Sequence, residues 1–184
     1  MNAAPAVERW WRSDVSRFVM GGNLVGALVT FSYFSFIDRE EVPTGTAANA
    51  AFFVVAFVVI AGLGTLLAAR WRPSALTGAG GTADAETRRR ALVMPFVLAG
   101  ISAMGWFLSG LAWGLLWPAL TGELTMARAL RLIIGTTLVG GTITTAFIFF
   151  AVERAWRRRL PLLFPRGDLS AVAGVPRLRV RPRL

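Results

Sequence analysis

The sequence predicts an all-α membrane protein with four transmembrane helices, arranged as two hairpins with both termini in the cytoplasm. Its 184 residues are 55% hydrophobic. The apolar residues are grouped in four blocks of about 20 residues or more, the length that a helix needs to cross a hydrocarbon core of about 30 Å. The arginines gather outside the central portions of these blocks. Helices are expected rather than barrel strands, because polar and apolar residues do not alternate in the blocks.

The four apolar blocks are each interpreted as one membrane span. They cover residues 18–37, 47–69, 91–120 and 129–152. No charge lies in their central portions, where an Arg or Asp would cost about 2.5–3.5 kcal/mol on insertion scales. The first block has no small-residue cleavage site at its end, so it is interpreted as a span rather than as a secretory signal peptide.

The spans divide the chain into five segments. Similar Trp-Arg boundaries at Trp71 and Trp156 suggest that the two hairpins are duplicates of each other, although such anchors mark any inner membrane interface. The predicted segments are a cytoplasmic N-terminal segment (1–17), a first transmembrane hairpin (18–69), a flexible cytoplasmic loop (70–90), a second transmembrane hairpin (91–152), and a basic cytoplasmic tail or lead-in to a missing fifth helix (153–184).

The arginine distribution predicts the orientation. The N-terminal segment, the loop at 70–90 and the region after the fourth block together hold 17 arginines, and the other two connections hold 3, namely Arg39, Arg128 and Arg131. The positive-inside rule then places both termini and the loop at 70–90 in the cytoplasm. We therefore expect a multi-pass membrane protein, whose net charge of +10 reflects topology rather than binding to nucleic acid.

The residue types argue against an enzyme. The chain has no cysteine and no histidine, which removes thiolate chemistry, the commonest metal ligand and the commonest general base. It also lacks paired carboxylates at catalytic spacing, a Gly-rich phosphate loop and a nucleophile with an adjacent base. We therefore predict no catalytic residue, no cofactor and no metal site in this chain.

Two features inside the spans are candidates for a ligand-binding or packing face. Asn23 lies between Gly22 and Gly26, a spacing that allows close helix approach, so its amide is interpreted either as a ligand or ion contact or as a packing residue. In the third block, four residues share one helical face: Trp106, Gly110, Trp113 and Trp117. They are interpreted either as the wall of a groove for a lipophilic ligand or as a stripe facing lipid or another helix.

Charged residues after the fourth block supply two further candidates. Glu153 and Arg157 are spaced to pair on a helix; the pair is either a joint that transmits helix motion or an exposed ion pair of little energetic weight. The closing arginines are expected to contact anionic lipid headgroups, at about 1 kcal/mol each near the surface. They are Arg177, Arg179, Arg181 and Arg183.

Two stretches of the chain resemble a known family: "GGNLVGALVTFSYF" and "FFAVERAWRRRLPLLFPRGDLSAVAGVPRLRVRPRL". They are similar to the N-terminal membrane part of actinobacterial class III adenylate cyclases, in which six membrane helices precede a HAMP linker and a cytoplasmic cyclase domain. The resemblance implies an anchor and sensor module of a bacterial plasma membrane, without the HAMP and cyclase parts, so any synthesis of cAMP would reside downstream. No metal-binding or substrate-binding residue of the cyclase domain carries over.

The leading functional prediction is therefore a membrane anchor and sensor of a signalling protein. A lipophilic ligand or the lipid environment would bias how the helices repack, and this motion would be transmitted past Glu153 toward the C-terminus. The expected partners are the anionic bilayer, a second copy of the chain and a lipophilic ligand. The alternatives are a stand-alone four-helix membrane protein, such as a small transporter subunit, and the anchor of another HAMP-containing sensor kinase.

Overall fold

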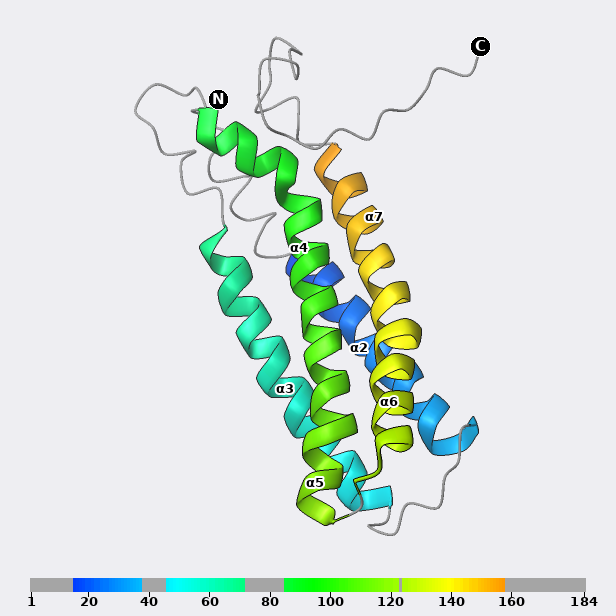
Figure 1. Cartoon of the computed structure of the whole chain (residues 1–184). Helices are drawn as coiled ribbons and strands as arrows, with labels where there is room; N and C mark the ends of the chain where they lie inside the picture. The colour runs from blue at the N-terminus through cyan, green and yellow to red at the C-terminus, as the bar shows by residue number, and fades with distance from the viewer. Residues whose placement is uncertain (1–14, 38–45, 72–84, 123, 158–184) are drawn as a thin grey trace.

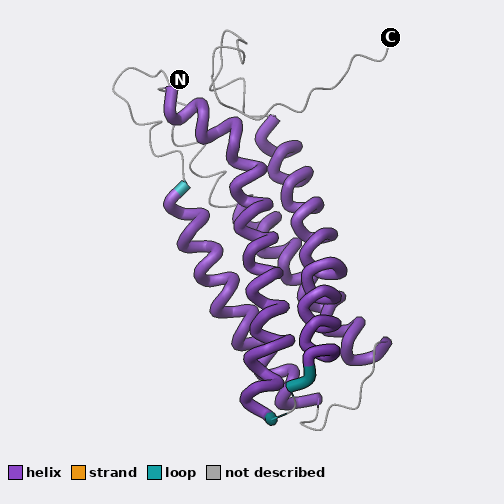
Figure 2. Tube along the Cα trace, viewed as in Figure 1, coloured by secondary structure: helices purple, strands orange, loops and turns teal. Residues whose placement is uncertain are grey.

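The computed structural model describes residues 15–37, 46–71, 85–122 and 124–157. Within these ranges the chain is helical apart from short turns and connections (Figure 2). It forms four helices that are long and apolar enough to cross a membrane. The all-α class and the four long apolar helices predicted from the sequence are confirmed, and each of these helices is called a span below. The closing arginines from Arg177 to Arg183 lie outside the described residues.

Each span is one continuous helical rod, and three of the four contain π-helical turns. The first is α2 (Ser16–Ser32) with η2 (Tyr33–Ile37), and the second is α3 (Thr46–Arg70). The third comprises α4 (Ala85–Leu111), η3 (Ala112–Leu116) and α5 (Trp117–Thr121). The fourth comprises α6 (Met126–Gly135), η4 (Thr136–Thr142) and α7 (Ile143–Arg157).

The third and fourth rods extend beyond their predicted apolar blocks. The third begins at Ala85 rather than at residue 91, and the fourth runs from Met126 to Arg157 rather than over 129–152. Both extensions are rich in Glu, Arg and Ala, which are good helix formers. In these two spans the apolar blocks therefore predict the hydrophobic part of the helix but not its full length.

Successive spans run in opposite directions (Figure 1). At one end of the bundle, the start of α2, the start of α4 and the end of α7 meet in a buried cluster that includes Val15, Met94 and Val152, with Ala68 of α3 packed against it. At the other end, Phe34 of η2 packs with Trp113 and Leu132.

The described arginines are divided unequally between the two ends of the bundle. Two of them, Arg128 and Arg131, lie in α6 at the end that holds Phe34. The other seven lie at the end that holds Val15, which we call the arginine-rich end: Arg17, Arg70, Arg88, Arg89, Arg90, Arg154 and Arg157. The charge asymmetry deduced from the sequence is thus an asymmetry between two ends of one folded bundle.

The fourth span packs against the first and the third, and two glycine pairs with GxxxG spacing face it: Gly22 with Gly26, and Gly110 with Gly114. A methyl group at Gly22 would lie 2.9 Å from Phe147 Cδ1, and Gly26 faces Thr144. A methyl group at Gly110 would lie 3.1 Å from the carbonyl oxygen of Ile133, and one at Gly114 would lie 2.8 Å from that of Ala129. The close approach that their GxxxG spacing predicts is therefore present at both pairs.

The second span is peripheral. None of the residues of α3 whose side chains are described is buried, whereas the other three spans each bury part of their length. In Figure 1, α3 lies at the edge of the bundle beside α4. The described structure is thus a tightly packed core of the first, third and fourth spans, with α3 laid against its side.

Replacing Gly26 with alanine should destabilise the core. The added methyl group would lie 2.7 Å from Trp106 Cζ2 and closer still to the Thr144 hydroxyl. Overpacking of this kind costs about 1–3 kcal/mol. The free energy of unfolding in mixed detergent micelles measures the effect.

The matched control is Gly21→Ala on the same helix, because no atom lies within 4 Å of a methyl group placed there. Gly21→Ala should leave stability within about 0.5 kcal/mol of the wild type or raise it slightly. Equal losses in both variants would contradict the packing described here.

Candidate functional site

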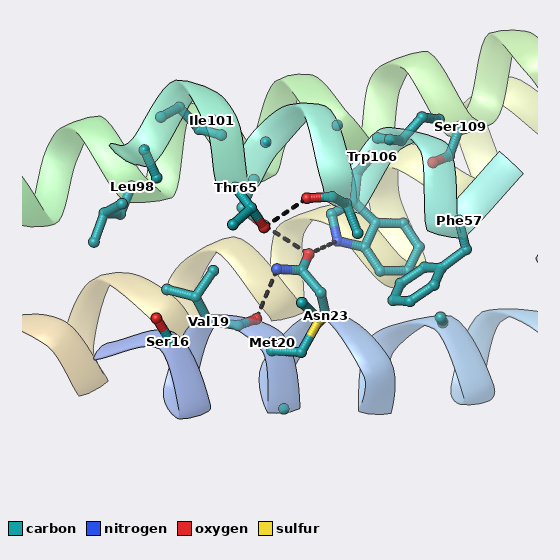
Figure 3. Close-up of a pocket in the computed structure, with 18 of the residues that line it drawn as sticks. Ser16, Val19, Met20, Asn23, Phe57, Thr65, Leu98, Ile101, Trp106 and Ser109 are labelled. Atoms are coloured by element: carbon teal, nitrogen blue, oxygen red, sulfur yellow. Dashed lines mark hydrogen bonds between the residues drawn. The ribbon is translucent and has the colours of Figure 1, made fainter. Parts of the chain in front are cut away.

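A cavity of about 550 Å³ lies between the three-helix core and α3 (Figure 3). Its walls come from α2, α3 and α4, and they are mostly apolar. It extends along α3 from Phe52 to Ala69, about 25 Å at a rise of about 1.5 Å per residue. The volume falls within the range of ordinary small-molecule sites, about 300–1,000 Å³. Along this length α3 packs against α4, where Ile60 faces Gly105, but it has few contacts with α2, and this leaves the space that forms the cavity.

One polar centre interrupts the apolar wall at Asn23 (Figure 3). Its Oδ1 accepts hydrogen bonds from Ser102 Oγ at 3.0 Å and from Trp106 Nε1 at 3.0 Å. Its Nδ2 donates to the carbonyl oxygen of Val19, one turn earlier in α2, at 2.8 Å. These bonds join the first span to the third across the inner wall of the cavity.

The orientation of the Asn23 amide follows from its partners. An indole N–H can only donate and a backbone carbonyl can only accept, so the oxygen must face Trp106 and the nitrogen must face Val19. An amide nitrogen carries two N–H groups, and only one of them has a partner among the described residues. Asn23 lines the cavity, so it brings one unused donor to that wall.

The Trp106 indole is fixed from both sides. Its ring lies between Gly26 of α2 and Gly140 of η4, where added methyl groups would approach Trp106 Cζ2 to 2.7 Å and Trp106 Cη2 to 2.5 Å. The side chain is only 5% exposed. Trp106 therefore contacts the first and fourth spans at once, and only glycine leaves room for its ring at these two positions.

A second tryptophan of the third span makes a similar bond to another helix. Trp113 Nε1 donates to Asn49 Oδ1 of α3 at 2.9 Å. The indole packs edge-on against Phe34 at 5.1 Å and Phe53 at 5.3 Å between ring centroids. Trp106 and Trp113 lie two helical turns apart on the third span. The first tryptophan is hydrogen-bonded to α2 and the second to α3.

The structure separates the residues that the sequence placed on one face. Trp106 and Trp113 line the cavity. Gly110 instead faces α6, where its missing side chain admits the backbone of Ile133. Trp117 stacks on Phe52 at 4.8 Å with an interplanar angle of 28°. The tryptophans thus face α2 and α3, and the glycine serves packing against the fourth span.

Sequence reasoning did not single out Ser102 or Asn49. A signal for Asn49 was available, because the chain has only three asparagines and no glutamine, and Asn23 and Asn49 are the two amides inside the spans. Two amides and two deep indoles in apolar helices indicate paired hydrogen bonds. Ser102 carried no comparable signal, since serine also serves as a small packing residue.

The predicted pair between Glu153 and Arg157 is present at the end of α7. Arg157 donates from Nη2 at 2.7 Å and from Nε at 3.2 Å to Glu153 Oε1. The Arg157 side chain is 70% exposed, so the pair contributes little to stability. Its neighbour Val152 is fully buried against Val15 and Leu98, which also line the cavity.

The chemistry available at the site is that of binding. Among the described residues no group of three or more His, Cys, Asp or Glu is placed to hold a metal ion. Arg17, at the arginine-rich end, is the charged residue in the cavity wall. The wall otherwise offers aliphatic and aromatic surface with hydroxyl and amide groups, which suits an apolar ligand held by a few hydrogen bonds.

Comparison with known proteins gives no relative: no family model, no curated protein and no solved structure matches the chain. The class defined by the fold is a bundle of four helices long and apolar enough to span a membrane.

Proposed function

We propose that this protein is a multi-pass membrane protein that binds a lipophilic ligand between α2, α3 and α4, and that it serves as the membrane anchor and sensor of a signalling protein. The observation that carries the proposal is the cavity of about 550 Å³ between a packed core and a peripheral helix. A ligand there would contact α3, whose described side chains are nowhere buried, on one side and fixed core residues on the other.

The expected mechanism is a change in how α3 and α2 pack at the arginine-rich end. A ligand filling the cavity touches Val15 and Leu98, and both belong to the buried cluster that contains Val152. Val152 precedes Glu153 directly in α7. Displacement within this cluster would therefore move the end of α7, from which the chain continues toward its C-terminus.

Orientation follows from the arginines. Seven of the nine described arginines lie at one end of the bundle, and the positive-inside rule assigns that end to the cytoplasm. The signal would accordingly leave the membrane on the cytoplasmic side. The resemblance to adenylate cyclases makes a cyclase domain the preferred effector, and a HAMP-linked sensor kinase is the second choice.

A small transporter subunit is the alternative. The observation in its favour is the set of buried threonine hydroxyls that have no hydrogen-bond partner among the described residues, including those of Thr30, Thr136 and Thr144. These residues lie outside the wall of the cavity, however. The Trp106 ring also fills the space beside Gly140, where Thr30 lies close. Binding and sensing account for the cavity more directly.

Filling the cavity should displace its ligand. Ala56 lines the cavity from α3 and is half-buried, so Ala56→Trp would place an indole in the space. We expect the wild-type protein, purified in mild detergent and extracted with organic solvent, to carry a lipophile enriched over bulk membrane lipid. Mass spectrometry should find that lipophile reduced at least about fivefold in Ala56→Trp.

The neighbouring substitution Val55→Trp is the matched control. Val55 is 61% exposed and lies outside the cavity wall, so this variant adds the same side chain to the same helix without filling the space. It should retain the lipophile. Identical extracts from the wild type and both variants would contradict a ligand in this cavity.

The signalling part of the proposal predicts a second messenger. Expression of the natural gene, with any coding sequence that follows residue 184, should raise cAMP in a host strain that lacks its own cyclase. Ala56→Trp should change that level, while Val55→Trp should not. A cAMP level that stays at the host background would exclude a cyclase as the effector. It would favour one of the alternatives, a sensor kinase anchor or a small transporter subunit.

A further inference from the structure

The geometry points to an uncharged, ring-bearing carbonyl compound with an apolar tail, a molecule of the quinone type, as the ligand of the cavity between α2, α3 and α4. The inference rests on the proposed binding function and adds the chemical class of the ligand. Three features of the wall carry it: an unused hydrogen-bond donor, the absence of a charge at the same level, and aromatic side chains beside the donor.

The unused donor belongs to Asn23. Both acceptor directions of its Oδ1 are taken by Ser102 and Trp106, and one of the two N–H groups of its Nδ2 is taken by Val19. The remaining N–H calls for an acceptor, and in an apolar setting an unmade hydrogen bond of this kind carries a desolvation cost. A ligand carbonyl supplies an acceptor without any proton of its own.

The wall favours a neutral acceptor over a carboxylate. Among the described residues that line the cavity, Arg17 carries the one ionisable side chain. It lies six residues before Asn23 in α2, or about 9 Å along the helix. A carboxylate placed at Asn23 would be desolvated without a cation beside it, which is far costlier than burial of a neutral carbonyl. A fatty acid would instead place its headgroup near Arg17, away from the amide.

Aromatic side chains flank the amide and give the preference for a ring. Figure 3 shows Trp106 and Phe57 beside Asn23, and Phe53 and Trp113 continue the wall toward the far end. Flat rings pack against such side chains in offset or edge-on arrangements. In the opposite direction the wall carries aliphatic side chains, among them Val19 and Leu98, which suit a hydrocarbon tail, before it reaches Ser16 and Arg17.

The discriminating experiment compares two ligands that differ only in the carbonyls. A quinone with a ten-carbon alkyl tail and a benzene ring with the same tail are titrated separately into the full chain in detergent micelles, with palmitate as the charged comparison. The wild type should bind the quinone about tenfold more tightly than the alkylbenzene, the effect of one buried hydrogen bond. It should also prefer the quinone to palmitate.

Two asparagine variants test whether the amide at the cavity is responsible. Asn23→Ala removes the unused donor, so the preference for the quinone should fall to within about twofold. Asn49→Ala removes the other amide that accepts from an indole of the third span, but Asn49 does not line the cavity. The tenfold preference should survive in Asn49→Ala.

The outcomes separate the inference from the function on which it rests. Equal binding of the quinone and the alkylbenzene by the wild type, or tighter binding of palmitate, would overturn the ligand class and leave the cavity as a binding site. Binding of none of the three would overturn the proposed function as well. The wild-type comparison decides the matter even if Asn23→Ala does not fold.

Discussion

The packing of the Trp106 indole is the constraint on which the rest of the structure depends. Its ring occupies the space between Gly26 and Gly140, and its N–H bonds to Asn23. One side chain of the third span thereby fixes the first and fourth spans together. In apolar helices the hydrophobic effect does little to hold neighbours together in lipid, so close packing and interhelical hydrogen bonds take its place.

The position of α3 follows from the same constraint. With the first, third and fourth spans closed around Trp106, α3 is left to contact the outside of this core. Its polar connection to the core is the bond from Trp113 to Asn49, near the end where α3 begins. Toward the arginine-rich end, the cavity lies between α3 and the core, and Ala68 of α3 packs against the buried cluster there. We propose that a ligand in this cavity changes how α3 packs against the core.

Much of this architecture could be predicted from the sequence, and the reasons are local. Hydrophobic length predicts the four helices, and GxxxG spacing predicts close approach at Gly22 and Gly110. The partners of those glycines are set by the packing of distant segments, so it could not be predicted that both glycine pairs face the fourth span. The sequence predicted a groove walled by Trp106 and Trp113 only as one of two interpretations. It could not predict that α3 forms the opposite wall, because that depends on how α3 packs against α2 and α4.

The most direct test of the core-and-periphery arrangement measures distances between spin labels. The chain has no cysteine, so pairs of cysteines introduced at exposed positions can be labelled selectively. Suitable positions are Met104 on α4, Leu66 on α3 and Phe150 on α7, which are 58%, 65% and 63% exposed. Pulsed electron resonance in lipid should give a narrow distance distribution for Met104 with Phe150 and a broader, ligand-sensitive one for Met104 with Leu66. Equally narrow, ligand-insensitive distributions for both pairs would contradict a peripheral, responsive α3.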